Sequence, residues 1–441
     1  MLSLRTITAL IAAVLLLSFI GCKKSSSTSP TVESHDLTIV LRNYFPPDTT
    51  GWGARIWLVV ASADGTTPIA ARQITHNGNV EFGDVGSDHV SLSVVTDYGG
   101  GSHNVTTYLH APAGTWLFTN DFEGTDTLGH ADITTTFPSG QNRILDLSWT
   151  GGGYATTLAD TATSYRMTVP VMSLEDISLT IMASLYTIQG GVRVPLRAGW
   201  LVAQPFVRLQ TNPYQVALNN LPSGRTVTAS RPLSYLVANA SRSGQRDQYY
   251  DLWAQMQGTD SMTFTVAYPD LPASFYFLYG GYNNGESGYN VAYSLTSLPS
   301  SMNIAEGSVT ATADLMTKRF TNITTTGSGD VLTAIWENPT DSWTVVSPLA
   351  SEIGIPTVPD SILQALNFFG ATLAPSSLWL DDYDTASNMD DWINLNFKNG
   401  APMPQRYHVR SSFYHTFSIS SPDGPNRARR HSGQGVLPPI R

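Results

Sequence analysis

Short runs of apolar and β-branched residues, separated by turn signals, dominate the pattern of the chain. Three early runs are Leu37–Leu41, Ile56–Val60 and Val90–Val95. Between them lie Asp64-Gly65 and Asn77-Gly78, which are dipeptides that favour tight turns. Because apolar runs of about four to eight residues bounded by turn residues are typical of strands, the pattern predicts a β-rich fold.

Two later segments have the pattern of β-hairpins. In the first, Gln248–Gln257 and Met262–Tyr268 flank the turn residues Gly258-Thr259-Asp260. In the second, Phe275–Tyr279 and Tyr289–Tyr293 flank a loop that contains an Asn-Gly pair. Each segment is therefore expected to form two antiparallel strands.

A single stretch has helical periodicity. Ser361–Phe369 follows Asp360, a residue type that caps first helical turns, and it ends before Gly370. The apolar residues of this stretch share one helical face. The sequence therefore predicts one short helix near 360–370.

The composition favours strands over helices. Among the 441 residues are 36 Gly and 26 Pro, while only four of the 24 basic residues are Lys and only eight of the 34 acidic residues are Glu. Lys and Glu favour helices, whereas Asp favours turns. The chain is therefore expected to be all-β.

The segment Ala63–Val95 carries a recognisable arrangement. A turn at Asn77-Gly78 is followed by Phe82-Gly83-Asp84-Val85 and by an alternating strand that begins at Val90. This arrangement resembles the carboxypeptidase-regulatory-like, or prealbumin-like, β-sandwich of cell-surface proteins. The resemblance implies a sandwich with a scaffolding or recognition role rather than a catalytic one.

The amino-terminal residues resemble a bacterial lipoprotein signal. Arg5 precedes an apolar run of 14 residues from Ile7 to Ile20, which is too short to span a membrane and fits a secretory signal. The run ends in Phe19-Ile20-Gly21-Cys22, and Cys22 is the only cysteine. This ending resembles a lipobox, which implies that Cys22 is lipidated. Because Lys23 stands where retention in the inner membrane uses Asp, the resemblance implies the outer membrane.

These signals divide the chain into tandem antiparallel β-sandwich domains, Ig-like or prealbumin-like, behind an anchor. Gly151-Gly152-Gly153 marks a hinge, and Val216–Ser230 echoes Val80–Val95, which suggests a duplicated sandwich. The expected parts are a signal peptide at 1–21, a lipidated Cys and Ser-rich tether at 22–35, sandwiches at 36–150 and 151–300, a third β-rich domain at 301–420 and a disordered basic tail at 421–441. An alternative role for that tail is an electrostatic contact with anionic sugars or lipid.

Charge and missing motifs exclude several classes of function. The net charge is -10, so the basic surface of a nucleic-acid binder is missing. Once Cys22 is lipidated, no thiol remains for disulfides, Cys-ligated zinc or a cysteine nucleophile. The sequence also lacks phosphate-loop, H-E-x-x-H, G-x-S-x-G and dinucleotide-binding motifs. No catalytic residue is assigned.

Two clusters are candidates for binding. Five carboxylates could supply oxygen ligands to Ca²⁺, the one cofactor the sequence suggests, and the alternative is a solvated acidic loop. These residues are Asp381, Asp382, Asp384, Asp390 and Asp391. Four tyrosines crowd the second hairpin and could form a ligand-binding platform for a sugar or a protein, with core packing as the alternative. They are Tyr276, Tyr279, Tyr282 and Tyr289.

The sequence therefore predicts a lipid-anchored protein of the bacterial cell envelope whose non-catalytic β-sandwich domains bind or scaffold. Its expected partners are the membrane, through the N-terminal lipid, and an envelope glycan or protein. Two alternatives stay open, namely an envelope glycan hydrolase with dispersed carboxylates and a carbohydrate-binding accessory module.

Overall fold

The computed structural model describes most of the chain between residues 35 and 417. The described ranges are 35–42, 44–45, 55–97, 101–119, 127–139, 144–149, 156–172, 178–189, 192–205, 212–220, 223–241, 249–268, 275–366, 368, 372–398 and 408–417. The expected signal peptide, Cys22, the tether up to residue 34 and the basic tail lie outside these ranges. No helix within the described residues has the length and apolar character needed to cross a membrane.

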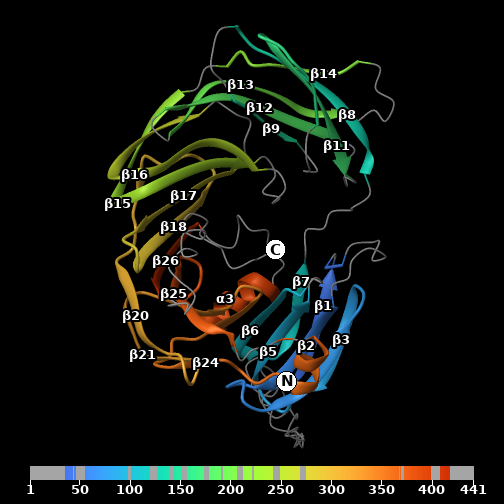
Figure 1. Cartoon of the computed structure of the whole chain (residues 1–441), viewed down its shortest axis with the longest axis vertical. Helices are drawn as coiled ribbons and strands as arrows, with labels where there is room; N and C mark the ends of the chain where they lie inside the picture. Colours follow the sequence, from blue (N-terminus) through green and yellow to red (C-terminus); the bar gives the residue numbers. More distant parts are fainter. Residues whose placement is uncertain are drawn as a thin grey trace, which may run out of the picture.

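One large sheet of 16 strands organises the molecule and bends into an arc (Figure 1). In sheet order its strands are β3 (Pro68–Ile74), β2 (Arg55–Ser62), β5 (His89–Asp97), β6 (His103–Pro112), β23 (Asp341–Ser347), β22 (Val331–Glu337), β25 (Ala374–Tyr383), β26 (Val409–Thr416), β18 (Ser287–Leu295), β17 (Phe275–Asn283), β15 (Ser223–Ser241), β16 (Tyr249–Tyr268), β13 (Val192–Pro205), β12 (Ser178–Gln189) and β9 (Ile144–Trp149), with β19 (Ser301–Met302) beside β15.

Three smaller sheets pack on the large sheet as second layers. They are β4 (Gly78–Asp84), β1 (Asp36–Arg42) and β7 (Gly114–Thr119); β10 (Thr156–Asp160), β11 (Ser164–Met172), β8 (Thr127–Thr136) and β14 (Tyr214–Ala217); and β20 (Gly307–Asp314), β21 (Arg319–Gly327) and β24 (Ile353–Gly354). An apolar core fills the space beneath each one. Strands hold most of the described residues and helices hold few of them, so the expected all-β, sandwich-type fold is confirmed.

The first two sandwiches repeat one pairing scheme. Strand β1 pairs antiparallel with β4 and parallel with β7, and β8 pairs in the same way with β11 and β14. In the large sheet, β2–β5–β6 correspond to β9–β12–β13. One strand differs, because β3 pairs with β2 whereas β10 pairs with β11. The scheme matches β4 with β11, so the sequence echo, which aligned β4–β5 with β14–β15, does not follow the structural repeat.

Strand pairing joins all three expected segments through the large sheet. Strand β9 precedes residue 150 and pairs with β12, and β18 precedes residue 300 and pairs with β26. The parallel pair of β6 and β23 connects the first sandwich to the β22–β25 region. The sandwiches therefore share one continuous sheet and follow one another along it.

The structure confirms one expected hairpin and overturns the other. Strands β17 and β18 pair antiparallel around a turn at 284–286. The other expected hairpin is wrong, because β16 runs unbroken through Gly258-Thr259-Asp260. Strand β15 is similarly long and pairs along β16, with register shifts between Thr228 and Tyr235. These irregularities accommodate the turn-forming residues without reversing the chain.

Helix α2 (Asp360–Ala365) confirms the short helix expected near 360–370. Its N-cap is Pro359, so Asp360 begins the helix instead of capping it. The sequence analysis missed α3 (Met389–Ile393) and the following π-helical turn η3 (Asn394–Lys398). The side chain of Asn388 caps α3 by accepting the Asp391 N–H at 2.9 Å.

Candidate functional site

The two faces of the large sheet differ in what covers them. On β25 and β26, Leu380 and Phe413 belong to the core beneath β20–β21–β24, on the outer side of the arc (Figure 1). Because side chains alternate along a strand, Trp379, Asp381 and Tyr414 lie on the opposite, inner face. The inner face of β25, β26, β18, β17 and β15 is therefore a concave surface of the arc.

Four aromatic side chains gather on this inner face, and we call them the aromatic patch: Tyr235, Tyr279, Trp379 and Tyr414. The rings of Tyr235 and Tyr279 lie 5.5 Å apart between centroids, and those of Trp379 and Tyr414 lie 4.7 Å apart. Tyr414 is buried, whereas the other three are partly exposed. The patch thus combines two aromatic pairs contributed by four strands.

Glycines on the neighbouring strands set the orientation of two of these rings. Tyr235 pairs with Gly281, and Tyr414 pairs with Gly288. A Cβ atom on Gly281 would lie 2.6 Å from the Tyr235 hydroxyl, and one on Gly288 would lie 2.4 Å from the Tyr414 hydroxyl. Each ring therefore extends along the sheet over a glycine and does not stand away from it.

The polar groups around the aromatic patch are uncharged or paired. The Tyr235 hydroxyl donates to Asn290 Oδ1 at 2.8 Å. Burial raises the pKa of Tyr414 to about 12 and also raises the pKa of Tyr279, so these hydroxyls stay protonated at neutral pH. Beside them, the Arg410 Nη2 atom lies 2.9 Å from Asp381 Oδ1, and both residues are buried.

The four tyrosines singled out in the sequence lie on two different faces. Tyr276 and Tyr289 are buried in the outer core, and Tyr282 stacks on Tyr289 with ring centroids 5.6 Å apart. Tyr279 alone of the four lies on the inner face. The alternative of core packing therefore describes Tyr276 and Tyr289, and the platform expected from the sequence does not form as one surface.

Three members of the aromatic patch, Tyr235, Trp379 and Tyr414, were missed. They come from strands separated by up to 179 positions in the sequence, so only the strand register brings them together. The pairing of an aromatic residue with a glycine on the neighbouring strand could have indicated the patch. That pairing can be recognised only once the register between the strands is known.

Each of the five aspartates expected to bind calcium has its own contacts or position in the structure. Asp381 accepts from Arg410 and Ser412, Asp384 lies 3.3 Å from His408 Nδ1, Asp390 lies 3.2 Å from His89 Nε2, Asp391 accepts the Ser387 N–H, and Asp382 is a half-buried residue of β25. Among the described residues, no three His, Cys or acidic side chains are grouped to hold a metal ion. Calcium binding by these residues therefore stays a prediction.

Asp330 adds a buried carboxylate that the sequence did not single out. Its Oδ2 atom accepts the Tyr383 N–H at 2.8 Å. Burial raises the pKa of Asp330, and the nearby Asp382, Asp391 and Asp381 carboxylates raise it further. The folded protein therefore favours the protonated form more strongly than the unfolded chain does.

This shift predicts that Asp330→Asn is more stable than the parent at neutral pH. The raised pKa stabilises the native parent at pH values below about 3.8, and this contribution is lost as the pH rises through the folded-state pKa. Asn keeps an oxygen that accepts the Tyr383 N–H but carries no charge. Urea unfolding at several pH values measures the difference, which should shrink toward acidic pH. A constant or inverted difference would contradict the expectation.

Asp132 is the matched control. Hydrogen bonds from Thr168 and Arg166 lower the pKa of Asp132. Asp132→Asn should therefore lose stability at neutral pH, and this loss should fade as the pH falls from the unfolded-state pKa through the lower, folded-state pKa. The two Asp→Asn changes are expected to have opposite signs.

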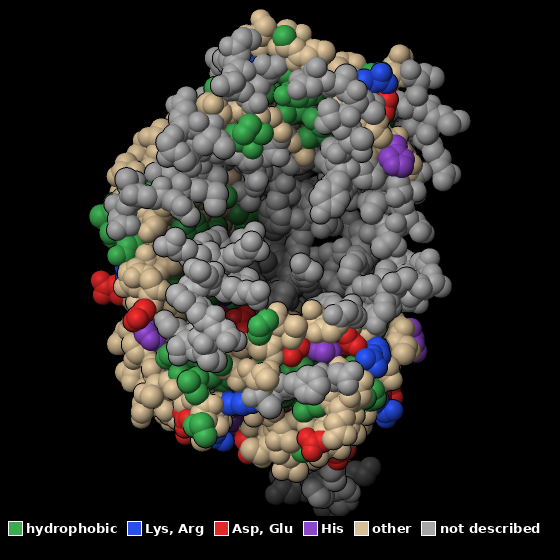
Figure 2. Space-filling view, viewed as in Figure 1, with side chains coloured by type: hydrophobic (Ala, Val, Ile, Leu, Met, Phe, Trp, Pro, Cys, Tyr) green, Lys and Arg blue, Asp and Glu red, His purple; other side chains and the backbone are tan. Residues whose placement is uncertain are grey.

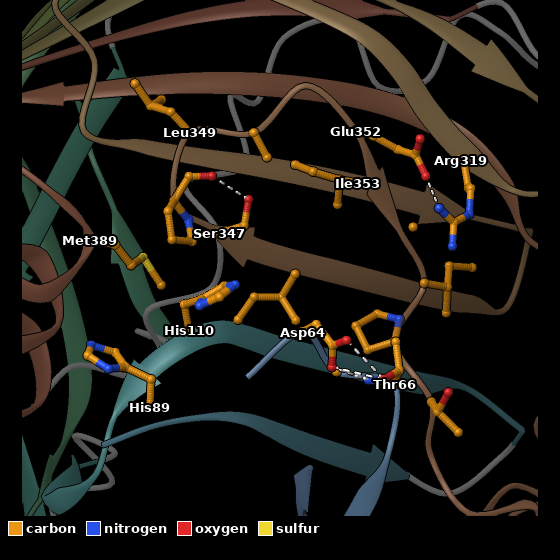
Figure 3. A pocket seen from close by; sticks show the side chains of 18 of the residues that line it. Asp64, Thr66, His89, His110, Arg319, Ser347, Leu349, Glu352, Ile353 and Met389 are labelled. Atoms are coloured by element: carbon orange, nitrogen blue, oxygen red, sulfur yellow. Dashed lines mark hydrogen bonds and ion pairs between the residues drawn. The ribbon is translucent and has the colours of Figure 1, made fainter. Parts of the chain in front are cut away.

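A second candidate is a groove of about 730 Å³ between the first sandwich and the chain segment that follows β23. Figure 2 shows acidic, basic and His side chains mixed over the lower half of the molecule, which contains the first sandwich. Figure 3 shows side chains from the first sandwich facing those from the later segment, namely Asp64, His89 and His110 against Leu349, Glu352 and Ile353. The backbone joins the two sides where Thr357 N–H donates to Gly65 O at 2.8 Å.

The charged groups of the groove already have partners within it. His89 pairs with Asp390, and Arg319 pairs with Glu352. The Ser62 hydroxyl and the Thr66 N–H donate to the Asp64 carboxylate and lower the pKa of Asp64. These contacts stabilise the walls of the groove.

Neither a family model nor a curated protein sequence matches this chain.

Proposed function

We propose that the protein is a lipid-anchored binding protein of the bacterial cell envelope, and that the concave face of its large sheet is its non-catalytic binding surface. One observation carries the binding role. The inner face presents partly exposed aromatic rings among uncharged groups, while the charges beside them, Asp381 and Arg410, neutralise each other. Aromatic side chains supply large contact areas at a low cost in conformational entropy.

The anchor rests on the lipobox-like residues that end in Cys22. The Ser-rich segment after Cys22 is suited to a flexible tether between lipid and sandwiches. Several acyl chains hold a protein on a membrane stably, whereas one chain does not. The acceptor position and the tether together support a location of the sandwiches at a membrane surface.

Cys22→Ala should move the protein from the membrane fraction to the soluble fraction. The substitution removes the thiol that would carry the lipid and leaves every described residue unchanged. Fractionation of a bacterial host expressing each form, together with incorporation of labelled palmitate, measures the effect. A Cys22→Ala protein that stays membrane-bound or still takes up palmitate would overturn the anchor.

The non-catalytic part of the proposal has a separate test. The soluble Cys22→Ala protein is incubated with envelope polysaccharides, and new reducing ends are measured over time. We expect none, because the proposal makes the inner face a binding surface. A steady release of reducing ends that Asp381→Asn abolishes would favour the glycan hydrolase instead.

A further inference from the structure

We infer that the aromatic patch binds a neutral oligosaccharide whose pyranose rings carry equatorial hydroxyl groups. The inference rests on the proposed binding function and names its ligand class. Such sugars expose apolar C–H groups on both ring faces and polar groups around the ring edge. A flat aromatic surface with hydroxyl and amide groups at its border complements both features.

The geometry supplies a cluster of aromatic rings on one face of the sheet. Gly281 and Gly288 leave room for the rings of Tyr235 and Tyr414 to extend along the sheet. The rings of Trp379 and Tyr414 partly overlap, with centroids 4.7 Å apart and an angle of 33° between the ring planes, so Tyr414 supports Trp379, which is the more exposed of the two. A side chain at either glycine would occupy the space of the ring, so the small residues and the aromatic residues act together.

Hydroxyl and amide groups that can bond to a sugar lie among the rings. The hydroxyls of Tyr235, Tyr279 and Tyr414 remain protonated, because burial raises the pKa of all three. The Asn290 side chain lies beside them and accepts from Tyr235. Hydroxyl and amide groups both donate and accept, as sugar hydroxyls do.

The neutralised charges of this face favour a neutral ligand over an anionic one. Asp381 Oδ1 accepts from Arg410 at 2.9 Å and from the Ser412 hydroxyl at 2.5 Å. The described part of this face therefore offers an anionic sugar no free cation. The salt dependence of binding should be small as a result.

Titration calorimetry with chitohexaose and cellohexaose tests the inference on the soluble Cys22→Ala protein. We expect binding of at least one of the two, with an affinity that does not depend on salt. Trp379→Leu and Tyr279→Leu keep an apolar side chain but remove the ring. Each should weaken binding about tenfold.

Tyr282→Leu is the matched control, because Tyr282 lies on the same strand as Tyr279 but packs against the outer core. It should leave the affinity unchanged. Circular dichroism and melting curves show that each variant is folded. If one inner-face variant does not fold, the other still decides the outcome.

Three results would overturn the inference: no binding of either sugar, equal loss of affinity in Tyr282→Leu, or binding of anionic heparin in place of the neutral sugars. None of them depends on the anchor, because membrane fractionation is scored separately. A protein that fractionates with the membrane but binds neither sugar would refute the oligosaccharide alone. A soluble parent protein would instead refute the proposed anchoring.

Discussion

Arg410→Met should lower the free energy of unfolding by about 3–5 kcal/mol, because it leaves a buried charge without its partner. The Arg410 guanidinium contacts Asp381 Oδ1 through Nη2 at 2.9 Å and Nε at 3.3 Å, and both side chains are almost fully buried. In the variant, the Ser412 hydroxyl still donates a hydrogen bond to Asp381 Oδ1. A single hydroxyl does not replace a cation in a buried site.

The paired variant separates the charge effect from lost packing. Arg410→Met combined with Asp381→Leu removes both charges and fills similar space, so it should recover most of the lost stability. Denaturant unfolding of the parent, both single variants and the double variant completes the cycle. If Arg410→Met costs less than about 1 kcal/mol, the pair resembles an exposed ion pair and this assignment is wrong.

The sequence predicted the positions of the strands better than it predicted which strands pair with one another. Local patterns are sufficient for β1, β2, β5 and the β17–β18 hairpin, because each one depends on residues close in sequence. The parallel pairing of β6 with β23 joins residues 238 positions apart, such as His103 and Asp341. Nothing in a local pattern specifies such a pairing, and this pairing makes the sheet continuous.

The candidate site failed to emerge from the sequence for the same reason. Tyr276 and Tyr279 are three positions apart and therefore lie on opposite faces of one strand. The sequence analysis grouped the tyrosines of the hairpin without separating the two faces of the sheet. The aromatic patch instead combines Tyr279 with rings from other strands. Helix α3 was missed because its cap, Asn388, lies in a segment that reads as an acidic loop.

His103→Ala should weaken the parallel pairing of β6 with β23, which we call the seam, and lower the free energy of unfolding by roughly 2–4 kcal/mol. His103 is buried at the start of β6, and its Nδ1 atom lies 2.7 Å from Asp341 Oδ1 at the start of β23. Since an ionised carboxylate only accepts, the imidazole N–H is the donor. Asp97 lies on the other side of the ring, 3.9 Å from Nε2, where Arg55 also binds it. Alanine would leave the Asp341 carboxylate short of a donor in a buried position.

The loss should be concentrated at the seam, and hydrogen exchange measures it there. Amides of β6 and β23 should exchange faster in His103→Ala, while those of β12 and β13, in the second sandwich, should keep their protection. His103→Asn retains one N–H donor at a similar distance from the backbone, so it should recover part of both the protection and the stability. Because Asn cannot reach toward Asp97 as the imidazole does, recovery should be incomplete. Unchanged exchange at β6 and β23 in His103→Ala would mean that the backbone ladder alone holds the seam, and that the sheet is continuous there without help from buried side chains.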